Sequence, residues 1–156
     1  MNRAESEMSA TPAPLPWQGD AMIRFATSAD VEAILTFWVA AAEGTDRRDD
    51  PAKVHALIER DPEALLVYEL DGAIVGTVVA GWDGWRAHLY RLAVAPETRR
   101  RGIGKQLIAA AEERFKAFGA FRVDAMVLHG NTDAHPAWTA TGYTLQEEWG
   151  RWVKHL

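Results

Sequence analysis

The chain has 156 residues, a formal net charge of −5 at pH 7 and no cysteine. Its length, with 48% hydrophobic and 25% charged residues, is typical of one soluble domain with a single core. The absence of cysteine excludes disulfides, thiolate metal sites and a cysteine nucleophile. The negative net charge argues against general nucleic-acid binding, and no apolar run is long enough to span a bilayer. We therefore expect a cytoplasmic protein with no nucleic-acid or membrane partner.

Residues 1–20 are rich in Ala, Pro, Ser and Glu, with Pro12, Pro14 and Pro16 at every second position. This composition is typical of a segment that does not build a packed core. We expect a disordered tail over residues 1–20 and one folded domain over residues 21–156.

The alternating residues 22–26 predict a first strand. Thr27 or Ser28 is placed to cap the helix that follows, and the helical spacing of five apolar residues predicts that they face the core: Val31, Ile34, Leu35, Trp38 and Val39. After a polar loop over residues 43–49, Pro51 suits the first position of a second short helix.

The pair Asp71-Gly72 stands between two apolar runs, residues 65–70 and 73–81. Asp-Gly in this context is a strong signal for a tight hairpin. A second turn over residues 82–85 leads into a strand that ends at Val94. We therefore expect three antiparallel strands in this part of the chain.

The second half alternates helix and strand. A helix over residues 103–118 carries an apolar stripe of Ile103, Leu107, Ala111, Phe115 and Phe118, and Gly119 ends it. The strand predicted over residues 121–128 is parallel to the strand before the helix, because a helical crossover joins them. We expect a short helix from about Asn131 and then two closing strands, over residues 143–147 and 151–155. The fold class is therefore α/β, with a mixed sheet of α+β type.

The most informative segment is the basic stretch from Arg99 to Lys105, between the strand and the long helix. Pro96 ends the strand, while Gly102 and Gly104 remove side chains where the first helical amides are unpaired. Helix-end amides, the helix dipole and nearby cations together form a site for a pyrophosphate. The segment is not a P-loop, because Arg99 occupies a position that requires glycine and Gln106 one that requires serine or threonine. It is not a dinucleotide-binding fingerprint either, because Leu107 occupies the position of the third glycine of that motif.

The combination Leu92-x-Val94-x-Pro96 followed by Arg99-x-x-Gly102-x-Gly104 resembles motif A of the GNAT N-acetyltransferase superfamily. The later residues Asn131 to Ala134, Trp138 and Thr141-Gly142-Tyr143 are similar to a second segment of that family, in the right order. The sequences of residues 76–79 and 102–103 resemble those of the small bacterial YpeA-type branch of this superfamily. The resemblance covers nearly the whole chain after the tail. It implies a GNAT-like fold whose central parallel strands splay apart, with acetyl-CoA as co-substrate and no metal.

The same resemblance implies which residues bind the co-substrate. Main-chain groups of the strand would hold pantetheine and the thioester, the basic loop would hold the diphosphate, and two later residues would line the site. In full these are Leu92, Ala93 and Val94, then Arg99, Arg100, Arg101, Gly102, Ile103, Gly104 and Lys105, then Asn131 and Trp138. At the position of Trp138, relatives usually have a tyrosine that acts as the acid. An indole releases no proton near neutral pH, so Trp138 cannot be that acid.

The attacking amine must be uncharged, so a base or a water chain must accept a proton. His88 and Tyr90 are our candidates for the catalytic residues, with Asp83 as a further base; for the acceptor we name Glu43, Trp82 and Trp85. The acceptor is a primary amine of a small molecule or of a protein. The alternative is a non-catalytic acyl-CoA-binding module, because the usual tyrosine is missing, and Trp149 and Trp152 would cover the sheet edge or a homodimer contact.

Overall fold

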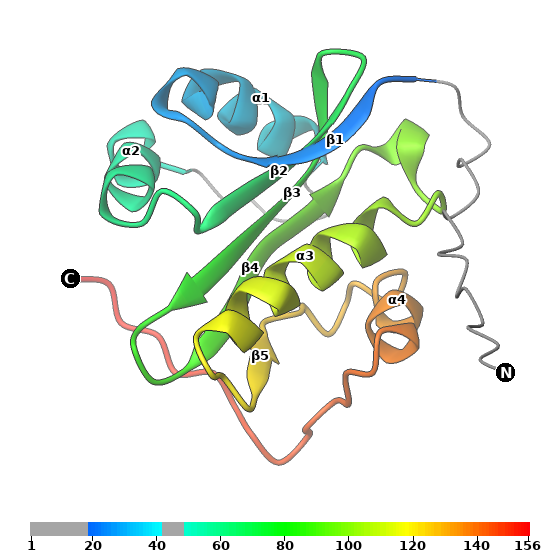
Figure 1. Cartoon of the computed structure of the whole chain (residues 1–156). Helices are drawn as coiled ribbons and strands as arrows, with labels where there is room; N and C mark the ends of the chain where they lie inside the picture. Colours follow the sequence, from blue (N-terminus) through cyan, green and yellow to red (C-terminus); the bar gives the residue numbers. More distant parts are fainter. Residues whose placement is uncertain (1–18, 42–48) are drawn as a thin grey trace, which may run out of the picture.

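A five-stranded sheet organises the part of the chain that the computed structural model describes, residues 19–41 and 49–156 (Figure 1). The first four strands are antiparallel neighbours, and the last two are parallel. The expected mixed sheet is confirmed, whereas residues 1–18 of the expected tail lie outside the described residues. In spatial order, which is also chain order, the strands are β1 (Ala21–Phe25), β2 (Leu65–Leu70), β3 (Ala73–Trp82), β4 (Ala87–Val94) and β5 (Val123–Ala125).

The turn between β2 and β3 follows the prediction from Asp71-Gly72. Both residues adopt left-handed backbone angles, with φ of 50° and 80°. This is the conformation that a two-residue hairpin turn with the twist of the flanking strands requires. At the next turn the Asp83 carboxylate accepts hydrogen bonds from the amides of Trp85 (2.8 Å) and Arg86 (2.6 Å), which fixes the entry to β4.

Helices cover both faces of the sheet (Figure 1). One face carries α1 (Val31–Ala41) and α2 (Pro51–Arg60), and the other carries α3 (Ile103–Ala117). The short helices η1 (Ser28–Asp30) and η2 (Pro96–Thr98) precede α1 and α3, and α4 (His135–Ala140) completes the set. Thr27 and Asp30 form a capping box before α1, and the Asp50 carboxylate caps α2 by accepting from the amide of Ala52 (2.9 Å).

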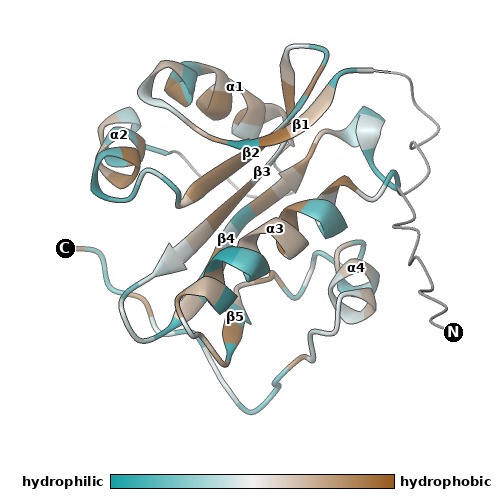
Figure 2. Cartoon of the chain, in the orientation of Figure 1, coloured by the Kyte–Doolittle hydropathy of each residue, from teal (hydrophilic) through white to brown (hydrophobic). Residues whose placement is uncertain are grey.

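The core lies between the central strands and the inner faces of α1 and α3. Figure 2 shows β2 and β3 largely hydrophobic, while hydrophilic colour concentrates on the outer sides of the helices. The prediction for α1 is correct for Val31, Ile34 and Trp38, which are buried, but wrong for Val39, which is 77% exposed. At 3.6 residues per turn Val39 lies across the helix from the buried stripe, and Phe37 takes the inward position instead.

The C-terminal third departs most from the sequence-based expectation. The strand predicted over residues 121–128 is confined to Val123–Ala125, and the helix expected from Asn131 begins at His135. The two closing strands predicted over residues 143–147 and 151–155 are wrong, because both segments are irregular. A three-residue edge at β5 offers too few main-chain groups to hold a further hairpin in register.

Candidate active site

The basic loop, residues 99–105, turns the chain sharply into α3. Arg100 and Gly102 adopt left-handed angles, with φ of 62° and 78°. The first hydrogen bond within the helix runs from the amide of Gln106 to the carbonyl of Gly102 (3.0 Å). The amides of residues 103–105 therefore have no acceptor inside the helix, and they form the donor set expected for a diphosphate.

Contacts with β4 fix the position of the basic loop. Ile103 is buried in the core, and a Cβ added at Gly104 would meet Cγ2 of Val94 at 3.7 Å, so the first turn of α3 lies directly against the end of β4. Arg99 Nε donates to the carbonyl of Val94 (3.2 Å). Arg100, Arg101 and Lys105 are exposed, so their charges add a screened attraction for an anion.

The strands β4 and β5 pair over a short stretch and then separate. Their parallel ladder joins Ala87–Leu89 to Val123–Ala125 and goes no further. Beyond it, Ala93 and Val94 still pair with β3 on one side. In the described part of the chain, the other edge of residues 92–94 has no strand beside it, so an extended ligand with amide groups would complete these main-chain hydrogen bonds.

A β-bulge interrupts β4 just before this free edge. Tyr90 pairs with Val79 and Ala93 with Thr77, so two residues of β4 face one residue of β3. Arg91, the first of the two, has a φ of 51°. A bulge of this kind bends the strand and redirects side chains. Nothing in the residue pattern of β4 signals it, and the sequence analysis missed it.

Because of the bulge, consecutive residues Tyr90 and Arg91 line the same hollow on the α1 and α2 side of the sheet. This hollow, the bulge hollow, has a volume of about 240 Å³. Arg91 forms an ion pair with Asp49 and lies 5.1 Å above the ring of Trp38. Nine residues line the hollow: Trp38, Asp49, Asp50, Lys53, Val54, Leu57, Val79, Tyr90 and Arg91.

The two catalytic candidates lie side by side on β4, with ring centroids of His88 and Tyr90 5.9 Å apart. His88 Nε2 is 3.9 Å from a carboxylate oxygen of Asp83, and Nδ1 is 3.9 Å from one of Asp124. Burial, and then the charge of Asp83, raise the pKa of Tyr90. The phenol therefore keeps its proton near neutral pH, and a carboxylate lies on each side of the imidazole.

The structure places the predicted acceptor residues elsewhere. Trp82 stacks on Phe118 with ring centroids 5.6 Å apart, on the α3 side of the sheet. Trp85 lies in the turn before β4, with the Arg86 guanidinium 4.4 Å above its ring. Both are at the opposite end of β4 from the basic loop, and Glu43 lies outside the described residues. Their role toward the acceptor stays a prediction.

The two later residues of the family pattern lie around α4. Ala134 occupies the N-cap position of this helix, so Asn131, from which the sequence predicts the helix to start, lies three residues before the cap. Trp138 packs edge-on against Tyr143, with ring centroids 5.0 Å apart. The Tyr143 hydroxyl donates to Glu112 (3.0 Å) and thereby ties the segment after α4 to α3.

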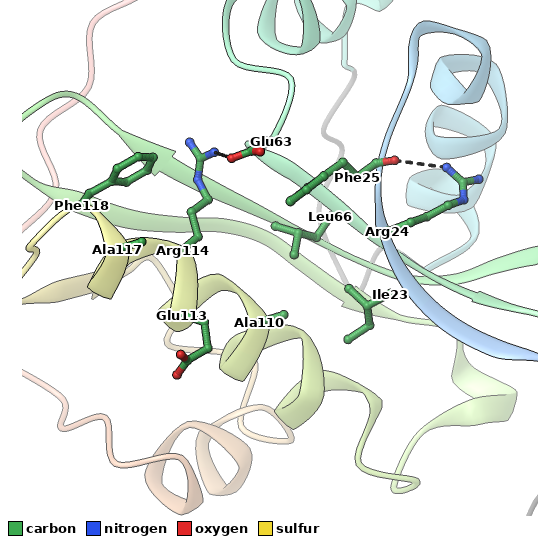
Figure 3. Close-up of a pocket in the computed structure, with 10 residues that line it drawn as sticks. All are labelled: Ile23, Arg24, Phe25, Glu63, Leu66, Ala110, Glu113, Arg114, Ala117 and Phe118. Atoms are coloured by element: carbon green, nitrogen blue, oxygen red, sulfur yellow. Dashed lines mark hydrogen bonds and ion pairs between the residues drawn. The ribbon is translucent and has the colours of Figure 1, made fainter.

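A larger hollow of about 490 Å³ lies between β1 and α3 (Figure 3). Its lining is mainly apolar. In Figure 3 the side chain of Arg114 extends toward Glu63, whereas that of Glu113 points away from Glu63. No residue of β4 lines it, whereas Tyr90 and Arg91, which directly precede the free edge of residues 92–94, line the bulge hollow. Within residues 19–41 and 49–156 no cluster of His, Asp or Glu is suited to a metal ion, and no helix is long and apolar enough to cross a membrane.

Comparison with known proteins shows the family and the fold. The sequence matches the acetyltransferase (GNAT) family over residues 22–143. It is 35% identical over 109 residues to an acetyltransferase of Pectobacterium atrosepticum, covering 70% of this chain and 77% of the relative. The fold is similar to yncA from Salmonella typhimurium with its cofactor acetyl-CoA (TM-score 0.68, 24% identity, 81% of this chain and 80% of that chain). It is also similar to the aminoglycoside N-acetyltransferase AAC(6')-Iy in complex with CoA (TM-score 0.70, 20% identity, 92% and 100%).

The residues present fit coenzyme A as a ligand. The left-handed turn at Gly102 leaves the first-turn amides of α3 without an acceptor inside the helix, and the edge of residues 92–94, which has no strand beside it in the described part of the chain, suits an extended arm with amide groups. The chain thus belongs to the GNAT family of acetyltransferases and is an acetyl-CoA-dependent acyltransferase.

Proposed function

We propose that this chain transfers acetyl directly to the primary amine of a small molecule that enters the bulge hollow. The observation that carries the proposal is the position of the bulge. It lies between the basic loop, which suits the diphosphate, and a hollow on the α1 and α2 side of the sheet. An acceptor there would meet the acyl group at the free edge of residues 92–94.

Acetyl-CoA, when bound, supplies an activated acyl thioester. The amides of residues 103–105 would hold its diphosphate, and main-chain groups of Leu92, Ala93 and Val94 its pantetheine arm. An amide from this edge also donates to the negative charge that develops on the carbonyl oxygen, which lowers the barrier by a few kcal/mol, on the order of 2.7–4. The chain has no cysteine, so direct attack by the amine is the simpler route.

His88 and Tyr90 are suited to opposite proton transfers. In our proposal His88 accepts the proton of the incoming ammonium, directly or through water, and Asp83 and Asp124 stabilise the resulting imidazolium. Hydrogen bonds from the amides of Arg86 and Trp85 lower the pKa of Asp83, so this carboxylate stays charged. Tyr90 is protonated at rest, donates its proton to the sulfur as the C–S bond breaks, and regains the proton that the acylated nitrogen releases; Trp138 cannot fill this role.

The hollow favours a small acceptor group. A volume of about 240 Å³ is below the ~300 Å³ at which pockets for drug-sized ligands begin, so it suits one aminoalkyl arm. Two acids, Asp49 and Asp50, and two bases, Lys53 and Arg91, line it, so its formal charge is balanced. The similar fold of an aminoglycoside N-acetyltransferase supports a small-molecule amine, whereas a protein N-terminus or lysine is the competing acceptor.

Thiol release from acetyl-CoA tests the proposal. The purified chain is assayed with diamines, amino sugars and amino acids, and in parallel with peptides that offer a free N-terminus or one lysine. Turnover on a small amine, with a mass gain of one acetyl group, is expected. Turnover on peptides alone would replace the acceptor class, and CoA binding without turnover on any amine would indicate a non-catalytic acyl-CoA-binding module.

A further inference from the structure

A buried hydrogen-bond relay connects α1 to the bulge of β4. Trp38 Nε1 donates to Thr77 Oγ1 (2.8 Å), and Thr77 Oγ1 donates to the carbonyl of Arg91 (2.9 Å). Trp38 is 6% exposed and Thr77 is 0% exposed. Thr98, the other buried threonine among the described residues, bonds to a carbonyl three residues earlier. The Thr77 hydroxyl instead joins separate elements, α1 and β4.

The backbone of Arg91 needs such support. A non-glycine residue at a φ of 51° is in a sparsely populated region and persists where its surroundings hold it there. Here its carbonyl accepts from Thr77, its guanidinium pairs with Asp49, and the same guanidinium lies over the ring of Trp38. Three separate contacts therefore fix the first residue of the bulge.

The carbonyl of Arg91 and the amide of Leu92 belong to one peptide unit. The described chain has no cis peptide bond, and in a planar trans unit the C=O and the N–H point in opposite directions. A hydroxyl that holds the Arg91 carbonyl toward Thr77 therefore also fixes the direction of the Leu92 N–H, away from β3. Leu92 is the first residue of the free edge.

We propose that Trp38 and Thr77 are positioning residues for the acetyl group. Neither reaches the free edge of β4 itself; they act by fixing the peptide unit that begins it. This inference rests on the proposed function, because it assumes that the acyl carbonyl binds at residues 92–94. It predicts that the relay affects recognition of the acetyl group much more than recognition of coenzyme A, whose diphosphate is held by the basic loop.

Calorimetry with acetyl-CoA and with CoA tests the relay without an acceptor. Wild type is expected to bind acetyl-CoA more tightly than CoA. Thr77→Val has nearly the same shape but no hydroxyl, and it should reduce that preference by about three- to tenfold, the equivalent of one hydrogen bond. Affinity for CoA should stay within about twofold. Thr77→Ser, which keeps the hydroxyl, should restore the preference.

Trp38→Phe provides a second route to the same relay. It removes the indole donor and should lower the preference for acetyl-CoA in the same way. The double variant Thr77→Val/Trp38→Phe should have an acetyl-CoA preference no smaller than that of the more impaired single variant, because the two groups act as one unit. If Thr77→Val fails to fold, Trp38→Phe and Thr77→Ser still decide the question.

Phe115→Leu is the matched control, since Phe115 is equally buried but lies in the last turns of α3. It should lower thermal stability and leave the acetyl-CoA to CoA ratio unchanged. The proposal is overturned if wild type binds both ligands equally, if Thr77→Val lowers both affinities alike or neither, or if Thr77→Ser behaves like Thr77→Val. Failure of the proposed function would look different: a normal binding preference with no turnover on any amine.

Discussion

At the scale of single residues, Gly104 distinguishes a phosphate site from an ordinary helix start. A Cβ there would make only ordinary contact, 3.7 Å from Val94 Cγ2, so Gly104→Ala should fold and gain about 0.5–1 kcal/mol of helix stability. Gly104→Asp has the same Cβ but adds a negative charge among the first-turn amides. We expect it to weaken CoA binding at least 100-fold, measured by calorimetry. Equal affinities of the Asp and Ala variants would contradict the diphosphate assignment.

The pair His88 and Tyr90 should give separable effects on turnover. His88→Gln removes the imidazole that accepts a proton, so kcat should fall by about 100-fold. Tyr90→Phe removes a proton donor whose pKa is raised by burial, and it should lower kcat about tenfold. Because the pKa of Tyr90 lies above its ordinary 10.0, loss of its proton should not limit kcat below that pH. Stopped-flow rates from pH 5.5 to 10 measure both effects, and an unchanged kcat in both variants would assign the proton transfers to other groups.

Asp30 should contribute to stability in a pH-dependent way. Hydrogen bonds from Arg24 (2.8 and 2.9 Å) lower the pKa of this carboxyl from its ordinary 3.8 to about 2. Because the folded pKa lies below the unfolded one, the stabilisation is present above pH 4 and is lost as pH falls from 4 toward 2. Wild type should exceed Asp30→Asn by about 1–2 kcal/mol at pH 7.

Urea unfolding at a series of pH values measures that difference. Asparagine can still accept from the Thr27 amide (2.7 Å in wild type), so the comparison isolates the charge rather than the cap. Glu32→Gln, at an exposed position of α1, serves as control and should change stability by less than about 0.5 kcal/mol. A gap between wild type and Asp30→Asn that is as large at pH 2.5 as at pH 7 would show that the ion pair is not its cause.

At the scale of elements, Arg114 anchors α3 to the segment between α2 and β2. Its side chain is 7% exposed, pairs with Asp61, lies 3.7 Å from Glu63 and covers the ring of Phe118 at 4.9 Å. Arg114→Ala should cost about 2–4 kcal/mol, since it removes packing as well as the pair. Arg114→Met should cost about 1 kcal/mol, because it keeps the stem and removes a buried Nε that has no hydrogen-bond partner. Chemical denaturation measures both, and equal costs would assign the whole effect to charge.

Elements were predictable where local rules agree with tertiary packing. Asp71-Gly72 and Pro51 set their turn and helix start by backbone chemistry alone, and the apolar stripe of α3 matched the core except at Phe118, which is 45% exposed. The start of α3 directly after Gly102 was equally predictable, because the glycine acts on the backbone within a few residues, whereas the diphosphate role of the basic loop stays a prediction. The prediction of two closing strands was wrong, because a strand needs a neighbouring strand edge to pair with, and β5 supplies only three residues.

The bulge marks the limit of sequence reasoning at the site. Arg91 carries no residue signal for a positive φ, since neither glycine nor asparagine stands there. Its conformation comes from Trp38, Thr77 and Asp49, which are 53, 14 and 42 positions away. A pattern in one strand cannot reveal contacts of that range. The same relay explains why Trp38, expected in the core from helical spacing alone, also carries a polar contact.

At the scale of the whole molecule, two electrostatic effects oppose each other. The chain carries a net charge of −5, which repels an anionic ligand at long range, whereas Arg100, Arg101 and Lys105 attract it locally. The Debye length is about 10 Å at 0.1 M salt, so distant charges are screened before those of the basic loop. Local attraction should dominate, and added salt should weaken CoA binding rather than strengthen it.

Ligand-linked melting provides the measurement. CoA at 100 times its Kd adds about 2.7 kcal/mol to the stability of the folded state, or roughly 5–10 °C in Tm for a domain of this size. Raising NaCl from 50 to 500 mM at fixed CoA should reduce that shift, and Arg101→Ala should make the reduction smaller because one screened charge is gone. A part of the shift should survive at high salt, since amides carry no net charge to screen. A shift that grows with salt would mean that the overall negative charge, and not the basic loop, controls binding.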